Sequence, residues 1–271
     1  MTTDFSPCPS PTPHLTAGRR GATGWLVLNR PERRNALSAE MWRAIPDLVR
    51  RLADDAEIRA LALMGEGGEA FAAGADISEF AGNRDDADAA RRYDAMTLEA
   101  FTALQECRKP VVAVIDGYCL GGGLALALAC DIRIASDRSI FALPPARLGL
   151  AYPLAGLRQL LATVTAARAK ELLFTARRVD AAEAHRIGLV HATVGAASLK
   201  AEAESILAMV AANAPLSIAA AKGMINALSG VSGDARSDAL AALADACFDS
   251  DDYKEGRRAF LEKRPPQFSG R

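Results

Sequence analysis

The sequence predicts an α/β protein with a helical C-terminal portion, and three stretches carry that prediction. A strand–helix–strand order over residues 25–64 is typical of parallel pairing, because a parallel connection needs a crossover helix. An apolar strand over residues 111–115 leads through three consecutive glycines into an apolar run of helical length. From about residue 155 the chain becomes rich in Ala, Leu and Arg and is expected to form successive helices.

The 271 residues divide into three segments. Residues 1–13 contain four prolines among several Ser and Thr residues, and we expect a disordered tail there. Residues 14–195 are expected to form the α/β core. Residues 196–271 are expected to form a helical region, whose apolar faces would be buried on a neighbouring subunit.

The first half of the core begins with strand-like pieces that end at Leu28. Ser38 is a suitable N-cap for a helix that runs to about Asp54, and a buried strand over residues 60–64 follows. The apolar residues of that helix fall on one stripe: Met41, Trp42, Ile45, Leu48, Val49 and Leu52. Residues 82–97 are polar and expected to be mobile, with a helix from about residue 96 to 107.

The second half of the core begins at the strand over residues 111–115. Short strands are predicted over residues 132–135, 140–143 and 189–194. Asp180 is a suitable N-cap for a short helix that ends near Arg186.

Composition excludes several classes of protein. Half of the residues are hydrophobic and the formal net charge is −1, so no strong field favours nucleic acid or an anionic membrane as a partner. The five cysteines and three histidines are scattered, which predicts neither a disulfide framework nor a metal site. No apolar run reaches the roughly 18 residues of a membrane span, and no secretory signal is visible. We therefore expect a cytoplasmic protein without a metal.

The run Gly121, Gly122 and Gly123 stands where a strand turns into a helix. Glycines there let the backbone approach a ligand and point free N–H groups at it, and the positive end of the helix dipole favours negative charge. No Ser, Cys-His pair or metal cluster accompanies the run in the sequence. One interpretation is a cradle for an oxyanion; the other is a glycine-rich packing turn beneath a buried helix.

Several short motifs, taken together and in order, resemble the crotonase superfamily of enoyl-CoA hydratase/isomerase-like enzymes. The resemblance extends from about residue 22 to residue 268. The stretches that carry it are LNRP (28–31), RNAL (34–37), FAAGADI (71–77), DGYCLGGG (116–123), CD (130–131), LFTA (173–176) and AFLEKR (259–264).

The resemblance implies a spiral of repeated strand–strand–helix units with a helical C-terminal trimerisation region. It implies a homotrimer or homohexamer that acts on acyl-CoA thioesters, with coenzyme A as part of the substrate and no further cofactor. By analogy, the backbone N–H groups of Ala75 and Gly122 would hold the thioester oxygen. This agrees with the oxyanion interpretation of the glycine run.

The resemblance also implies contacts to coenzyme A. The adenine end would lie against residues 73–77, and Arg33 with Lys263 would pair with phosphates, Lys263 from a neighbouring subunit. The expected contact residues are Arg33, Ala36, Ala73, Ala75, Asp76, Ile77, Gly121, Gly122, Phe260 and Lys263.

The sequence departs from the family at the acid/base residues. Family hydratases carry two glutamates, at positions that match Ala125 and Pro145 here. Adding water to a double bond needs groups that activate the water and protonate carbon. Alanine and proline can do neither, which argues against two-glutamate hydration.

Tyr152 is the first candidate to replace the glutamates, because the methylmalonyl-CoA decarboxylase branch of the family also has a tyrosine there. The alternative is a core tyrosine whose hydroxyl finds one partner. Asp76 is expected to cap or brace its turn rather than to act as an acid. Glu79 is a second candidate for the catalytic acid; the alternative is that it is a solvent-facing helix residue without a catalytic role. The stretch over residues 82–97 could also bring Arg91, Arg92 or Tyr93 over the pocket.

The sequence thus predicts an acyl-CoA enzyme that stabilises a thioester enolate. Decarboxylation through Tyr152 is one alternative, and a non-catalytic acyl-CoA-binding homologue is another.

Overall fold

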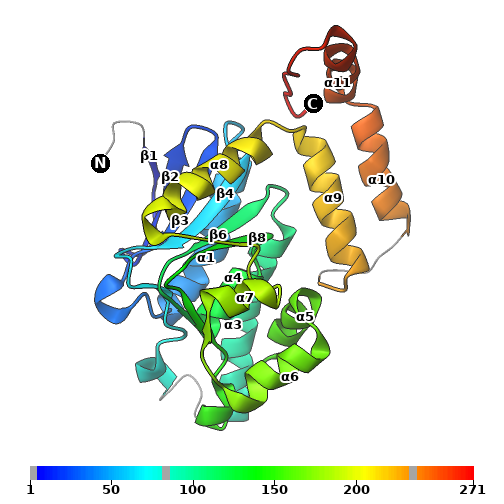
Figure 1. Ribbon diagram of the computed structural model, residues 1–271. Coiled ribbons are helices and arrows are strands. Elements are labelled where there is room, and N and C mark those ends of the chain that lie inside the picture. Colours follow the sequence, from blue (N-terminus) through cyan, green and yellow to red (C-terminus); the bar gives the residue numbers. More distant parts are fainter. Residues whose placement is uncertain (1–4, 81–85, 232–236) are drawn as a thin grey trace.

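The computed structural model describes residues 5–80, 86–231 and 237–271. Two sheets form its centre, and helices cover both faces of the larger sheet (Figure 1). The strands are β1 Ser6–Cys8, β2 Leu15–Arg20, β3 Thr23–Leu28, β4 Ala60–Gly65, β5 Ala70–Ala72, β6 Val111–Ile115, β7 Tyr118–Leu120, β8 Ile132–Ser136, β9 Ile140–Ala142, β10 Val179–Asp180 and β11 Ala192–Val194.

The α-helices lie between and after these strands. Their bounds are α1 Ala39–Asp54, α3 Ala87–Glu106, α4 Gly122–Leu128, α5 Leu154–Thr163, α6 Ala166–Thr175, α7 Ala181–Arg186, α8 Leu199–Ala211, α9 Pro215–Leu228, α10 Ser237–Phe248 and α11 Asp251–Glu262. Short 3-10 helices accompany them in the described part of the chain: η1 Pro31–Arg33, η2 Ile77–Glu79, η3 Pro145–Leu148 and η4 Ala196–Ser198.

The two sheets are wound together along the chain. The larger has the order β1-β2-β3-β4-β6-β8-β11, antiparallel up to β3 and parallel thereafter, and the smaller has the order β10-β9-β7-β5. The pairs β4/β5, β6/β7 and β8/β9 each give one strand to each sheet, and α3 and α4 connect successive pairs. This confirms the α/β class and the expected spiral of strand–strand–helix units.

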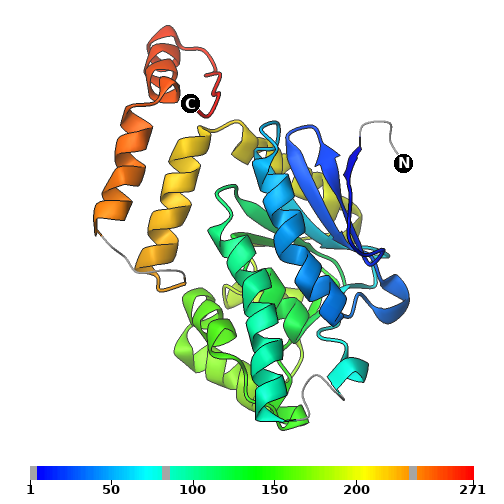
Figure 2. The ribbon, with the colours of Figure 1, turned by 180° about the vertical axis from the view of Figure 1, so that it is seen from behind.

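Side-chain alternation divides the core into two apolar clusters. On β4, Ala60 and Ala62 belong to the cluster on the α8 face, whereas Leu61 and Leu63 belong to the larger cluster with α1 and α3. Successive residues of a strand point to opposite faces, so a parallel strand covered on both sides is apolar throughout. Figure 2 shows α1 and α3 lying beside one another on the second face.

Helix α1 forms as the sequence predicts. The Ser38 hydroxyl accepts a hydrogen bond from the Met41 amide at 3.3 Å, and the apolar stripe of the helix is buried. Asp180 also caps α7, accepting from the Glu183 amide at 2.8 Å. The predicted strand over residues 189–194 is shorter, because β11 begins only at residue 192.

The N-terminal segment differs from the expected disordered tail. Residues 6–8 form β1, which pairs antiparallel with β2, and Thr12 is buried. Its prolines fit because an edge strand has one side without ladder partners. Residues 1–4 lie outside the described part.

The expected mobile stretch over residues 82–97 also differs. Helix α3 already begins at Ala87, since Asp86 accepts a hydrogen bond from the Ala89 amide at 2.7 Å, and Ala89 and Tyr93 are buried. The polar residues of this stretch occupy the outer face of an amphipathic helix. Residues 82–85 lie outside the described part of the chain.

The C-terminal region divides at residue 214. Helix α8 covers one face of the larger sheet, whereas α9, α10 and α11 form an arm that leaves the core (Figures 1 and 2). Large apolar side chains of the arm are exposed: Ile225, Leu228, Phe248, Phe260 and Leu261. No single helix in the described ranges is long and apolar enough to cross a membrane; residues 196–211 and 215–228 meet the length and composition test only jointly, across a 103° bend.

Candidate active site

An apolar pocket lies where α1, α3, α4, η3 and α5 meet the end of β5. Its empty volume is about 820 Å³. The lining residues are Trp42, Ala73, Gly74, Ala75, Ile77, Phe80, Tyr93, Thr97, Phe101, Gly121, Gly122, Ala125, Pro144, Pro145, Leu148, Leu150, Ala151, Tyr152, Pro153 and Gly156. None of these described residues carries a charge, so the pocket surrounds a bound group with aliphatic and aromatic side chains.

Two backbone amides line this pocket. The Leu37 amide donates to the Gly74 carbonyl at 2.8 Å and the Asp76 amide donates to the Leu37 carbonyl at 2.9 Å. In such a parallel bridge the N–H of the intervening Ala75 points away from Leu37. Gly122 is the first residue of α4, so its N–H has no acceptor in the preceding turn. Neither amide donates to another residue that the structure describes.

The two amides are close neighbours. A Cβ placed on Gly122 would lie 3.3 Å from the Ala75 nitrogen. Gly74 and Gly121 precede the two amides with φ of 112° and 51°, in the left-handed region that favours glycine. The glycine run is therefore more than a packing turn, because its Gly122 amide lies at the pocket beside the Ala75 amide of another loop, and neither amide has an acceptor among the described residues.

Tyr152 also lines the pocket. Its hydroxyl is buried and has no hydrogen-bond partner among the described residues. Burial raises the pKa of this phenol far above its usual value, so the hydroxyl keeps its proton near neutral pH. A buried donor without a partner is unusual and costs free energy, which marks Tyr152 as a candidate contact for a bound molecule.

The two positions that match the glutamates of family hydratases both line this pocket. Ala125 lies one turn into α4, and Pro145 is the first residue of η3. The remaining polar groups already have partners: Trp42 Nε1 donates to the Tyr93 hydroxyl at 3.0 Å, and Thr97 Oγ1 donates to the Asp94 carbonyl at 3.0 Å.

Other predicted residues lie beside the pocket. Asp76 caps η2 by accepting hydrogen bonds from Ser78, and it also accepts one from Arg30 at 2.6 Å. These hydrogen bonds lower the pKa of Asp76, and the one from the Ser78 hydroxyl has the largest effect. Glu79 accepts from the Ala39 amide at 2.8 Å and is not part of the lining. Ala36 offers its carbonyl to Arg30.

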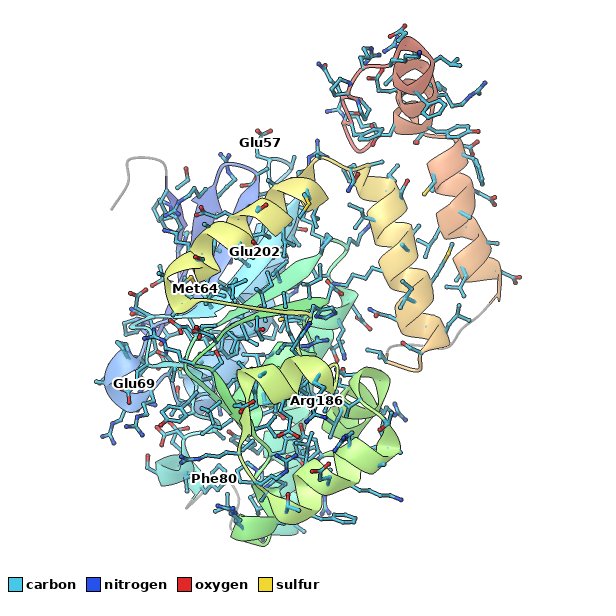
Figure 3. All side chains as sticks on the ribbon, in the orientation of Figure 1. Glu57, Met64, Glu69, Phe80, Arg186 and Glu202 are labelled. Atoms are coloured by element: carbon cyan, nitrogen blue, oxygen red, sulfur yellow. The ribbon has the colours of Figure 1, made fainter. Side chains whose placement is uncertain are left out.

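Some predicted contact residues are not brought to the pocket. Phe260 and Lys263 belong to the arm, at the end of the molecule opposite to Phe80, which is labelled in Figure 3. Arg33 is exposed at the end of η1. Of the three candidates that the sequence offers on α3, Tyr93 lines the pocket, whereas Arg91 and Arg92 do not.

Several lining residues carry no sequence signal that marks them as part of a site. Trp42 falls on the apolar stripe of α1, which predicts a core position, and no motif distinguishes Phe80, Thr97, Phe101, Leu148 or Leu150. An apolar side chain gives the same periodic signal whether it packs on a sheet or on a ligand pocket. Only their convergence from different elements distinguishes them.

The fold and site together define a spiral α/β protein with a pair of unpaired amides at an apolar pocket. Comparison with known proteins gives the family: residues 20–271 match the family described as enoyl-CoA hydratase/isomerase. The chain belongs to that family, within the crotonase superfamily.

Similar proteins cover nearly the whole chain. A short-chain-enoyl-CoA hydratase from Clostridium acetobutylicum is 35% identical over 249 residues, covering 91% of this chain and 94% of the relative. A crotonyl-CoA hydratase from Syntrophomonas wolfei is 37% identical over 246 residues, covering 90% and 93%. A crystal structure of an enoyl-CoA hydratase/carnithine racemase from Magnetospirillum magneticum has a TM-score of 0.89 and 34% identity, covering 97% of each chain.

Proposed function

We propose that this chain is an enzyme that binds an acyl-CoA thioester and stabilises its enolate between the amides of Ala75 and Gly122. The observation that supports this is the pair of unpaired N–H groups at the apolar pocket. As the α-carbon gains an electron pair, negative charge develops on the thioester oxygen. Two preorganised donors stabilise that charge, and loss of one such donor costs about 3 kcal/mol in enzymes where it has been removed.

The reaction at the α-carbon follows from what else the pocket offers. Hydration needs a group that activates water, and the described lining contains no carboxylate or imidazole. An acyl group bound here would lie beside the neutral Tyr152 hydroxyl, which can donate a hydrogen bond or a proton but cannot act as a base while protonated.

Decarboxylation is the second candidate, and the unpartnered Tyr152 hydroxyl favours it. The bond between the α-carbon and the carboxylate breaks, CO₂ leaves, and the electron pair moves to the thioester oxygen; a proton from water or from the Tyr152 hydroxyl then adds to the α-carbon in place of the lost CO₂. An apolar pocket destabilises a bound carboxylate relative to departing CO₂. Tyr152 would orient that carboxylate by a hydrogen bond.

The coenzyme A portion would extend from the acyl pocket past residues 73–77, with its phosphates near Arg33. We further propose that a neighbouring copy supplies Phe260 and Lys263, in a homotrimer or homohexamer. The exposed apolar side chains of the α9–α11 arm support association, because a second copy can bury them.

Mass spectrometry of the purified protein with crotonyl-CoA and methylmalonyl-CoA tests the reaction. Crotonyl-CoA is chosen because one relative is named for it. We expect turnover of at least one thioester, and Tyr152→Phe should lower loss of CO₂ about tenfold, the effect of one hydrogen bond to a charged group. Tyr118→Phe, which alters a tyrosine outside the lining, is the control.

Each product has a distinct meaning. Gain of water on crotonyl-CoA would show hydration with acids other than the family glutamates. Loss of CO₂ that Tyr152→Phe weakens would establish the decarboxylase. Tight binding of both thioesters without product would identify a non-catalytic acyl-CoA-binding homologue instead of an enzyme.

A further inference from the structure

Two loops meet at the Ala75 amide. One is the turn over residues 29–37 and the other is the segment over residues 73–77 that follows β5. Their backbones join through the bridge between Leu37 and Ala75 and through a bond of 2.9 Å from the Ala73 amide to the Arg34 carbonyl. The Leu37–Ala75 bridge is isolated and does not belong to a named strand. The direction of the Ala75 N–H is therefore set by this bridge and its neighbouring contacts, and not by an extended strand ladder.

Arg30 adds a side-chain connection between the same two loops. One of its terminal nitrogens, Nη1, donates to Asp76 Oδ2 at 2.6 Å and to the Ala36 carbonyl at 3.3 Å. The side chains of Arg30 and Asp76 are only 16% and 12% exposed, so water screens this pair far less than a surface pair. Glu32, 3.9 Å from Arg30 Nε and 64% exposed, is a weaker neighbour.

The position of Arg30 is itself fixed. Its backbone N–H donates to Asn35 Oδ1 at 2.9 Å, and Asn35 is fully buried with φ of 54°. Asn35 Nδ2 donates in turn to the carbonyls of Glu66 and Ala70, at 2.9 and 2.7 Å. The guanidinium therefore reaches Asp76 from a turn that is anchored to the β4–β5 connection.

We propose that Arg30 is a positioning residue, which holds the Ala75 amide toward the thioester oxygen through Asp76 and the Ala36 carbonyl. This inference rests on the proposed oxyanion role of Ala75. Asp76 is the next residue after Ala75, so a shift of its carboxylate moves the Ala75 Cα and with it the Gly74–Ala75 peptide unit, which carries the Ala75 N–H. A misplaced donor weakens binding of the charged enolate more than binding of the neutral thioester, because the charged acceptor makes the stronger hydrogen bond.

The test compares a charged with a neutral ligand. Acetoacetyl-CoA forms an enolate that ultraviolet absorbance detects, and butyryl-CoA presents a neutral thioester oxygen. For Arg30→Met we expect enolate affinity to fall about tenfold and butyryl-CoA affinity to change less than about twofold. Arg30→Lys, which keeps the charge, should recover part of the loss. Arg51→Met, which removes an arginine from the exposed pair with Asp47, is the control.

A double-mutant cycle with Asp76→Asn shows whether the two residues act together. The double variant Arg30→Met/Asp76→Asn should bind the enolate with an affinity no lower than that of Arg30→Met alone. Equal losses for enolate and butyryl-CoA, or a lower melting temperature with unchanged enolate affinity, would overturn the proposal and leave Arg30 a residue of the fold. Failure of the unmodified protein to favour the enolate would instead defeat the oxyanion role, and this inference with it.

Discussion

Gly122→Ala is expected to lower turnover about a hundredfold while the protein stays folded. The new methyl group would lie 3.3 Å from the Ala75 nitrogen and 3.3 Å from Trp42 Cζ2, so it occupies the space between the two amides. A thioester oxygen then loses its position close to both donors. Gly122 has no positive φ and opens α4, so the backbone accepts alanine there.

The measurement is kcat for the thioester that mass spectrometry identifies, together with the melting temperature. Gly195→Ala is the matched control, because its methyl group would meet only Asp137 Oδ2 at 4.0 Å. Gly123→Ala should instead impair folding, since its Cβ would lie 2.5 Å from the Ala72 carbonyl oxygen. Undiminished turnover of a folded Gly122→Ala protein would refute the oxyanion role.

Lys222→Met is expected to have the largest effect on stability, about 3 kcal/mol. The Lys222 side chain is 8% exposed, and its Nζ donates to Asp131 Oδ2 at 2.8 Å, to the Leu104 carbonyl at 3.0 Å and to the Lys109 carbonyl at 3.3 Å. Methionine fills a similar volume but leaves a carboxylate and two carbonyls without this cation. The free energy of unfolding from denaturant titration measures the loss.

This loss should depend on pH. Burial raises the pKa of Asp131, and Lys222 opposes that shift, so removing Lys222 raises the pKa further. When the pKa of a carboxyl group is higher in the folded than in the unfolded state, the folded state binds the proton more tightly. The free energy of unfolding of the protein then rises as the pH falls from the folded-state pKa toward the unfolded-state pKa. The penalty of Lys222→Met should therefore be smaller at about pH 5 than at about pH 8.

Two variants complete this test. Lys222→Met/Asp131→Asn should recover part of the stability, because a neutral amide needs no cation and can still accept from the Val111 amide. Lys254→Met removes a lysine whose pair with Asp251 is exposed and screened by water, and it should leave the free energy of unfolding almost unchanged. Equal losses at both pH values would show that lost packing, and not the charge of Asp131, dominates.

Local signals predicted the longer elements of the fold. Helix α1 follows from its cap and its apolar stripe, and β6 follows from five consecutive apolar residues between turns. The start of α3 was missed because its first turns are polar on one face. Strands β5 and β7 were missed because each has only three residues and lies among glycines and alanines, which give no strand signal.

The sequence by itself determined the α/β order and the glycine-rich turn over residues 121–123, and its resemblance to the crotonase superfamily implied Ala75 and Gly122 as the two amide positions. The order and the turn are local properties: strand and helix periodicity, and glycines with the backbone freedom that a close approach requires. The tertiary structure alone decided that Ala75 and Gly122 lie side by side, that Ala125, Pro145 and Tyr152 face the same pocket, and that Arg30 reaches Asp76. Such contacts join residues from different turns of the spiral, and no local pattern in the chain encodes the distance between them.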